Sequence, residues 1–325
     1  MWLLMDFAPT VGWGLARRVS RASSGELPEI SPRELTQFVA SLRVLAREAG
    51  RIGARHMELP GAGAGEIRVV DWAGWGRAVQ RMTDGAVDQL GLPEREPGLR
   101  TSARGVLNGL VAGTAIGKIG PQLLGQYDPF TGDDALYLVA PTILQHERTR
   151  GFVPEHFRLW IALHEQTHAL QFQRAPWLRE YLATRIQSML TDDVPLLDGL
   201  KGWARSGDAA AILSGEGGAM ADIKATMTFL EGHADHVADT AARMRIRTVR
   251  QLRKAFTRPE RPGLLGRLSA TFDKGAQYRD GLAFCTKVAS LKGNRGLRRA
   301  FDAPENLPTA AEIADPPAWI ARVHG

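Results

Sequence analysis

A stripe of side chains at helical spacing runs through the middle of the chain. Pro154 suits the first position of a helix, where its missing amide hydrogen is not needed, and the helical period continues to Gln173. The residues that recur every three or four positions are Phe157, Ile161, His164, His168 and Phe172. This spacing places both imidazoles on one face, one turn apart, so the fold must bring polar groups to that face.

The two histidines belong to the motif His164-Glu165-x-x-His168. In this arrangement the imidazoles can occupy two corners of a tetrahedral zinc site, while the glutamate reaches a metal-bound water. A shuffled chain of this composition would contain the motif only about 0.01 times. Because Cys285 is the single cysteine, any further ligand must be His, Asp or Glu. The alternative to a metal site is a pair of core histidines that neighbouring groups satisfy.

The third ligand is expected on a second helix, over residues 222–244. Glu231 and Asp235 lie one turn apart there and point the same way. Glu231 can bind the metal, while Asp235 accepts the free ring N–H of a ligand histidine and fixes its tautomer. His233 is the rival third ligand; it lies about 200° round the helix from Glu231, so only one of them can face the metal.

These residues predict a zinc-dependent hydrolase, and a peptidase first of all. Glu165 would take a proton from the zinc-bound water that attacks the peptide carbonyl, and would return it to the leaving amine. An oxyanion donor is also needed. Tyr278 is the candidate for that role, with Tyr127 and His236 in reserve.

The best strand candidate is the apolar run of residues 135–140. As an edge strand shortly before the metal helix, it would offer unpaired backbone groups to an extended peptide substrate. The apolar periodicity predicts helices over residues 32–50, 72–90, 154–173, 177–190, 222–244 and 275–291. Glycines at every fourth position from 105 to 117 predict a close helix–helix contact.

Several segments carry a family resemblance: the helix with the two histidines, Leu124–Phe130, Leu138–Pro141, Leu230–Asp235, Glu305–Pro308 and Trp319–Val323. In these the chain resembles the zincin-like metallopeptidases common in actinobacteria, some of which are linked to biosynthesis of a deazaflavin coenzyme. The resemblance implies a mainly α fold, with a zincin-like catalytic core, a small β element and an additional helical lobe. It also implies zinc ligands at His164, His168 and Glu231 and a catalytic acid/base at Glu165. We therefore divide the chain into a helical N-terminal lobe (1–130) and a zincin-like catalytic lobe (131–325).

Charge and hydropathy indicate which partners the protein binds and where it is located. Lys and Arg number 41 against 35 Asp and Glu, and because these charges are spread along the chain we expect no nucleic-acid partner. No segment has the length of a signal peptide or a membrane span, so we expect a cytoplasmic protein that acts on a peptide or protein. The alternative is an inactive zincin-like scaffold that docks an anionic partner through the Arg-rich stretch 243–261. The sequence does not indicate the oligomeric state.

Overall fold

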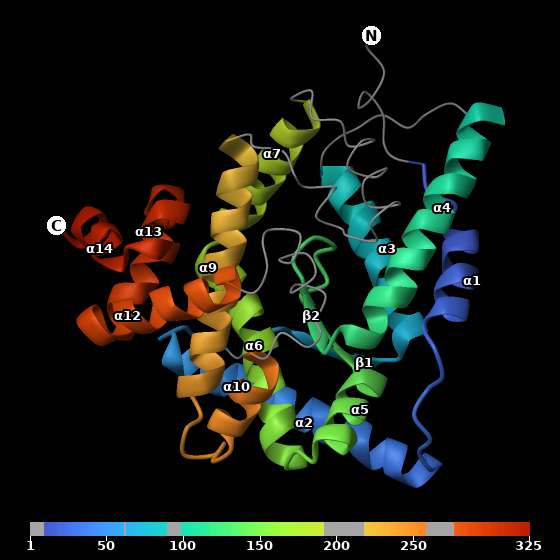
Figure 1. Cartoon of the computed structure of the whole chain (residues 1–325), viewed down its shortest axis with the longest axis horizontal. Coiled ribbons are helices and arrows are strands. Elements are labelled where there is room, and N and C mark those ends of the chain that lie inside the picture. Colours follow the sequence, from blue (N-terminus) through green and yellow to red (C-terminus); the bar gives the residue numbers. More distant parts are fainter. Residues whose placement is uncertain (1–9, 62, 90–98, 192–217, 258–275) are drawn as a thin grey trace.

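The structure is a computed structural model that describes residues 10–61, 63–89, 99–191, 218–257 and 276–325 (Figure 1). Its first half contains α1 (Trp13–Ser23), α2 (Pro32–His56), β1 (Glu66–Val70), α3 (Trp72–Gln89), α4 (Leu99–Ile119), β2 (Gly125–Asp128), β3 (Ala135–Val139) and α5 (Ala140–Arg150). Its second half contains α6 (Pro154–Arg174), α7 (Leu178–Thr191), α9 (Gly218–Thr240), α10 (Val249–Thr257), α12 (Ala276–Arg298), α13 (Ala310–Ala314) and α14 (Pro316–His324). This composition confirms the mainly α class with a small β element.

The helix α6 lies at the centre of the fold and is buried along most of its length. It packs against α2 and against α9, and α12 also packs against α9. Figure 1 shows α6 and α9 side by side, with α2 and β2 next to α6. Because α6 carries the two motif histidines, the groups that can meet them come from α9 and from the adjoining strands.

The helix α2 begins as the sequence dictates and extends further than the periodicity predicts. The Ser31 hydroxyl accepts from the Glu34 amide, and the Glu34 carboxylate accepts from the Ser31 amide, so the start is doubly capped. The helix then continues past the expected end at Gly50 to His56. Gly53 is used for close packing: a Cβ there would lie 2.8 Å from Leu170 Cδ1 on α6. A glycine inside this helix therefore marks a contact and not an end.

The three strands form one sheet in the order β1-β3-β2. β3 is fully buried and pairs with β1 in parallel and with β2 in antiparallel register. The expectation that this strand lies at an edge and binds substrate was wrong, because both of its edges are already hydrogen-bonded. β1 and β2 come from before residue 130 and β3 from after it, and the division into lobes 1–130 and 131–325 stays a prediction.

The glycines at every fourth position lie on α4, which packs against α1. A Cβ at Gly109 would approach the Gly12 carbonyl oxygen to 2.6 Å, and one at Gly113 would approach the Ala16 carbonyl oxygen to 2.5 Å. This confirms the predicted close helix contact. In the described part of the chain, no helix has both the length and the apolar character needed to span a membrane.

Candidate metal centre

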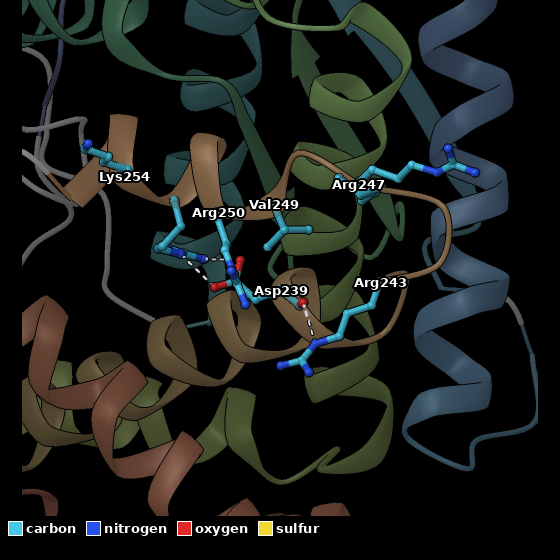
Figure 2. A pocket seen from close by; sticks show the side chains of 8 residues that line it. Asp239, Arg243, Arg247, Val249, Arg250 and Lys254 are labelled. Atoms are coloured by element: carbon cyan, nitrogen blue, oxygen red, sulfur yellow. Dashed lines mark hydrogen bonds and ion pairs between the residues drawn. The ribbon is translucent and has the colours of Figure 1, made fainter.

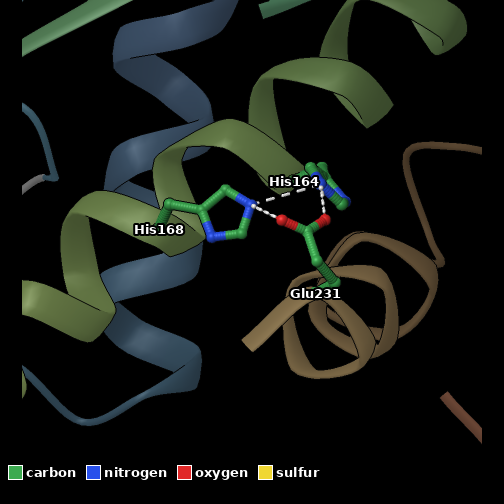
Figure 3. Close-up of side chains that lie close together, drawn as sticks. All are labelled: His164, His168 and Glu231. Atoms are coloured by element: carbon green, nitrogen blue, oxygen red, sulfur yellow. Dashed lines mark hydrogen bonds and ion pairs between the residues drawn. The ribbon is translucent and has the colours of Figure 1, made fainter. Parts of the chain in front are cut away.

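Three side chains from two helices converge on one point (Figure 3). His164 and His168 project from α6, and Glu231 faces them from α9. The two Nε2 atoms lie 3.3 Å apart. The Glu231 carboxylate oxygens lie 3.3 Å from His164 Nε2 and 3.4 Å from His168 Nε2. One ligand atom from each residue falls within 4.8 Å of the other two, which is the spacing of ligands around a single metal ion.

The outer nitrogen of each imidazole is held by a second group. His164 Nδ1 lies 3.0 Å from Asp235 Oδ1, and a carboxylate can only accept, so His164 Nδ1 is the donor. His168 Nδ1 lies 3.0 Å from Gln171 Oε1. The orientation of that amide is fixed because Gln171 Nε2 donates to the Leu230 carbonyl oxygen over 2.8 Å. His168 Nδ1 is therefore also a donor.

These contacts test whether the site fits a cation. When each ring is neutral, with its proton on Nδ1, the lone pairs of Nε2 point toward each other and toward the Glu231 carboxylate. Lone pairs at these distances repel one another unless a positive charge lies between them. A zinc ion bonded to two imidazole nitrogens and one carboxylate supplies that charge and matches the donor set of catalytic zinc sites. The residues present therefore fit the metal.

The pKa values of the groups around the centre also indicate that a positive charge is favoured there. Burial disfavours the charged form of His164, yet hydrogen bonds to Asp235 and Glu231 outweigh it and raise the pKa of His164 well above its usual value. Burial also disfavours the charged form of His168, and here its effect prevails, so the pKa of His168 is lowered. Burial opposes ionisation of Asp235 as well, but the nearby guanidinium of Arg253 lowers the pKa of Asp235 to about 2. Asp235 is therefore an ionised acceptor for His164.

Arg253 anchors this carboxylate from α10. Its Nη1 donates to Asp235 Oδ2 over 2.6 Å, and its Nε donates to Asp239 Oδ2 over 2.8 Å. The guanidinium also lies 4.9 Å from the centre of the Trp160 ring, in a cation–π contact on α6. A chain of contacts thus runs from α10 through Asp235 to His164.

Glu165 lies beside the centre without taking part in it. Its side chain is buried against β2, where a Cβ at Gly125 would lie 2.7 Å from Glu165 Cγ. Only glycine leaves room for the glutamate at that position. Burial raises the pKa of Glu165 to about 7, assisted by the negative charge of Glu231. Among the described residues its carboxylate makes no hydrogen bond, so it is available to exchange a proton.

A known family matches this sequence over most of its length. The pattern of the zincin-like metallopeptidases matches residues 11–320, which is nearly all of it. The chain belongs to this family. Membership confirms the zincin-like core expected from the sequence, and it implies a metal, usually zinc. The actinobacterial subgroup and the link to a deazaflavin coenzyme stay predictions.

This chain is similar to a solved structure from Chloroflexus aurantiacus, a candidate hydrolase with a novel fold. The two share 25% sequence identity and superpose with a TM-score of 0.69. The similarity covers 97% of this chain and 99% of the other. No curated protein matches the sequence.

Two other histidines considered for this site, His233 and His236, make different contacts. His233 points away from the centre: its Nδ1 accepts from Gln171 Nε2 over 3.1 Å, and its ring packs against Phe301. His236, a reserve candidate for the oxyanion donor, has its Nε2 3.3 Å from Asn294 Oδ1. Of the two candidates for third ligand, the structure brings Glu231 to the histidines.

Of the two tyrosines considered as oxyanion donors, Tyr127 is engaged in another contact. The Tyr127 hydroxyl donates to Asp134 Oδ1 over 2.9 Å, which takes up its only proton. Burial and the nearby Asp134 raise the pKa of Tyr127 to about 12. Tyr278 lies on α12, and its side chain is outside the part of the structure that is described.

Two residues of this site, Gln171 and Arg253, were not predicted from the sequence. Gln171 is three residues from His168 on the same helix, and this i,i+3 spacing was a usable signal for a side-chain contact. Arg253 gave no such signal, because it lies on another helix and reaches Asp235 only through the tertiary fold.

Proposed function

We propose that this chain is a zinc-dependent metallopeptidase. His164, His168 and Glu231 would hold the zinc, and Glu165 would serve as the catalytic acid/base. The observation that carries the proposal is the pairing of a convergent His-His-Glu set with a buried glutamate that is not engaged in a hydrogen bond. The family of the chain and the candidate hydrolase it resembles support a hydrolase.

A bound zinc supplies Lewis-acid chemistry, polarising the scissile carbonyl and lowering the pKa of the attacking water. The protein's own part is proton transfer at the Glu165 carboxylate. Glu165 accepts a proton as the water oxygen bonds to the carbonyl carbon, and donates it to the nitrogen as the carbon–nitrogen bond breaks. The products are a carboxylic acid and an amine, so atoms and charge balance. A group that must both accept and release this proton works best when its pKa lies near the working pH.

The second groups on the imidazoles keep the ligands in place. Asp235 and Gln171 fix the Nδ1–H tautomers of His164 and His168, so that Nε2 of each ring remains a lone-pair donor. Arg253 holds Asp235 in turn. In this account these three are positioning residues, because they act on the metal only through the ligands.

Tyr278 remains the proposed oxyanion donor. A phenol within hydrogen-bond reach of the carbonyl oxygen would stabilise the negative charge that develops as water attacks. Replacing Tyr278 with Phe should lower kcat and leave KM little changed, because the bond forms chiefly in the transition state. An unchanged kcat in Tyr278→Phe would remove this residue from the mechanism.

The proposal is tested by incubating the zinc-loaded protein with a diverse peptide mixture and identifying cleavage products by mass spectrometry. Wild type should generate new termini, and Glu165→Gln should retain zinc while cleavage falls by about 10²- to 10⁴-fold. Glu155→Gln is the matched control, because Glu155 is an exposed glutamate in the first turn of the same helix. Cleavage by Glu165→Gln at the wild-type rate would contradict the proposed role of Glu165.

A further inference from the structure

A basic hollow lies where α9 ends and α10 begins (Figure 2). Its volume is about 720 Å³, within the size range of sites that bind small molecules. The cationic side chains around it are Arg243, Arg247, Arg250, Arg253 and Lys254. Ile246 and Val249 add an apolar part to the wall. The hollow is separate from the three metal-ligand candidates.

The positive charge of this hollow is not offset locally. Arg247, Arg250 and Lys254 are exposed, and among the described residues none of them forms an ion pair. Among the described residues that line the hollow, Asp239 is the acidic one. Its two oxygens accept from Arg253, and Oδ1 also accepts from Trp160 Nε1 over 2.9 Å. Asp239 is therefore already committed, and Arg247, Arg250 and Lys254 line the hollow without a partner carboxylate among the described residues. Figure 2 shows Arg247 and Lys254 extending in opposite directions from this region.

The kind of cation indicates the kind of anion. A guanidinium is a planar fork of N–H donors that suits the oxygens of phosphate and carboxylate groups in paired hydrogen bonds. Several cations around one space favour a ligand with more than one negative charge, which a phosphate ester or diphosphate provides and a simple carboxylate does not. The apolar wall at Ile246 and Val249 can contact the organic part of such a molecule.

We propose that this hollow binds a small molecule that carries phosphate groups. The phosphates contact Arg247 and Arg250, and Lys254 adds a third charge at the rim. The site does not depend on the proposed peptidase activity. It does adjoin the metal centre, because Arg253 belongs to the wall of the hollow and also holds Asp235.

Isothermal titration calorimetry with inorganic pyrophosphate tests the proposal on the zinc-loaded full chain. Wild type should bind one pyrophosphate per chain, and Arg247→Ala combined with Arg250→Ala should weaken binding about tenfold or more. The matched control is Arg18→Ala combined with Arg21→Ala, a pair of exposed arginines with the same spacing on α1. This control pair should leave the affinity unchanged. Arg253 is not altered, because it also supports the metal centre.

Three further measurements distinguish binding in this hollow from binding elsewhere or of another kind. The variant His164→Ala, which removes a proposed metal ligand, should still bind pyrophosphate; loss of binding there would place the anion on the metal and overturn the proposal. Citrate should bind more weakly than pyrophosphate, and equal affinity would overturn the preference for phosphate. A short DNA duplex that binds more tightly than pyrophosphate would make the surface a nucleic-acid contact instead. Equal weakening by both arginine pairs would show only a general effect of charge and would also overturn the proposal.

Discussion

Arg253 Nη1 donates to Asp235 Oδ2 over 2.6 Å, and the other oxygen of that carboxylate lies 3.0 Å from His164 Nδ1. One carboxylate thus joins the guanidinium of α10 to the imidazole of α6. Because Asp235 and Arg253 are largely buried, removing either charge leaves the other without its partner in a poorly solvated place.

Arg253→Met should therefore lower the free energy of unfolding of the metal-free protein by about 3–5 kcal/mol. Methionine retains much of the packing on Trp160 but leaves Asp235 and Asp239 without their cation. Urea unfolding of wild type and variant measures the change. Arg250→Met, three residues earlier and exposed, is the control and should be close to wild type. A stability equal to wild type in Arg253→Met would show that the ion pairs contribute little.

Gln171→Ala should weaken zinc binding about 10- to 100-fold, because His168 loses the acceptor that fixes its tautomer and ring orientation. Competition with a zinc chelator of known affinity gives the measurement. Gln173→Ala is the control on the same helix, since Gln173 donates to the Gly63 carbonyl and not to a ligand. If both variants bound zinc as tightly as wild type, Gln171 would have only a structural role.

The local features of the site were predictable because they depend on spacing along the chain. The HExxH histidines share a face of α6 through helical geometry alone, and Glu231 and Asp235 share a face of α9 for the same reason. The position of Glu231 opposite the histidines requires two helices to cross, and no periodicity specifies that crossing. The choice between Glu231 and His233 therefore depended on the rotation of α9, which the structure provides.

Two of the three strands could not be predicted from the sequence. β2 contains Gly125 and Asp128, which are poor strand formers, and it is stabilised by pairing with β3 and by packing against α6. β1 pairs with a strand 69 residues further along the chain, as Glu66 opposite Ala135 shows. Short strands of this kind form through non-local pairing, so the apolar run of β3 was identified and its two neighbours were not.

Gly281→Ala should destabilise the protein by about 1–3 kcal/mol or more, because a Cβ at this position would lie 2.2 Å from the Thr228 carbonyl oxygen on α9. The contact sets the distance between α9 and α12, so the shift would also move the helix that carries Glu231. Thermal unfolding compares the variants. Gly14→Ala is the control, since nothing lies within 4 Å of a Cβ there. Equal stability of Gly281→Ala and wild type would mean that the two helices separate at little cost.

Stability should fall as the pH is lowered from 6.5 toward 4, and His146 should account for part of the fall. Burial, together with the charge of Arg150, lowers the pKa of His146 to about 4 in the folded protein. Between that value and the usual value of 6.5 the unfolded chain binds a proton that the folded chain does not. The contribution of His146 is thus complete above pH 6.5 and is lost on acidification, at about 1.4 kcal/mol per pH unit.

Urea unfolding at several pH values checks this, with His146→Gln as the variant. The slope of unfolding free energy against pH should be smaller in the variant than in wild type over that window. His56, whose pKa burial also lowers to about 4, would still contribute in both proteins. An identical slope in His146→Gln would show that this histidine is not held neutral in the folded state.

The central claim is that one zinc ion is bound by His164, His168 and Glu231, and anomalous scattering at the zinc absorption edge from crystals of the zinc-saturated protein tests it most directly. The expected result is a single peak, about 2.0–2.2 Å from Nε2 of each histidine and from one Glu231 oxygen, with no fourth protein ligand. Zinc bound by His233 in place of Glu231, zinc closed off by a fourth side chain, or no peak at the two histidines would contradict the account.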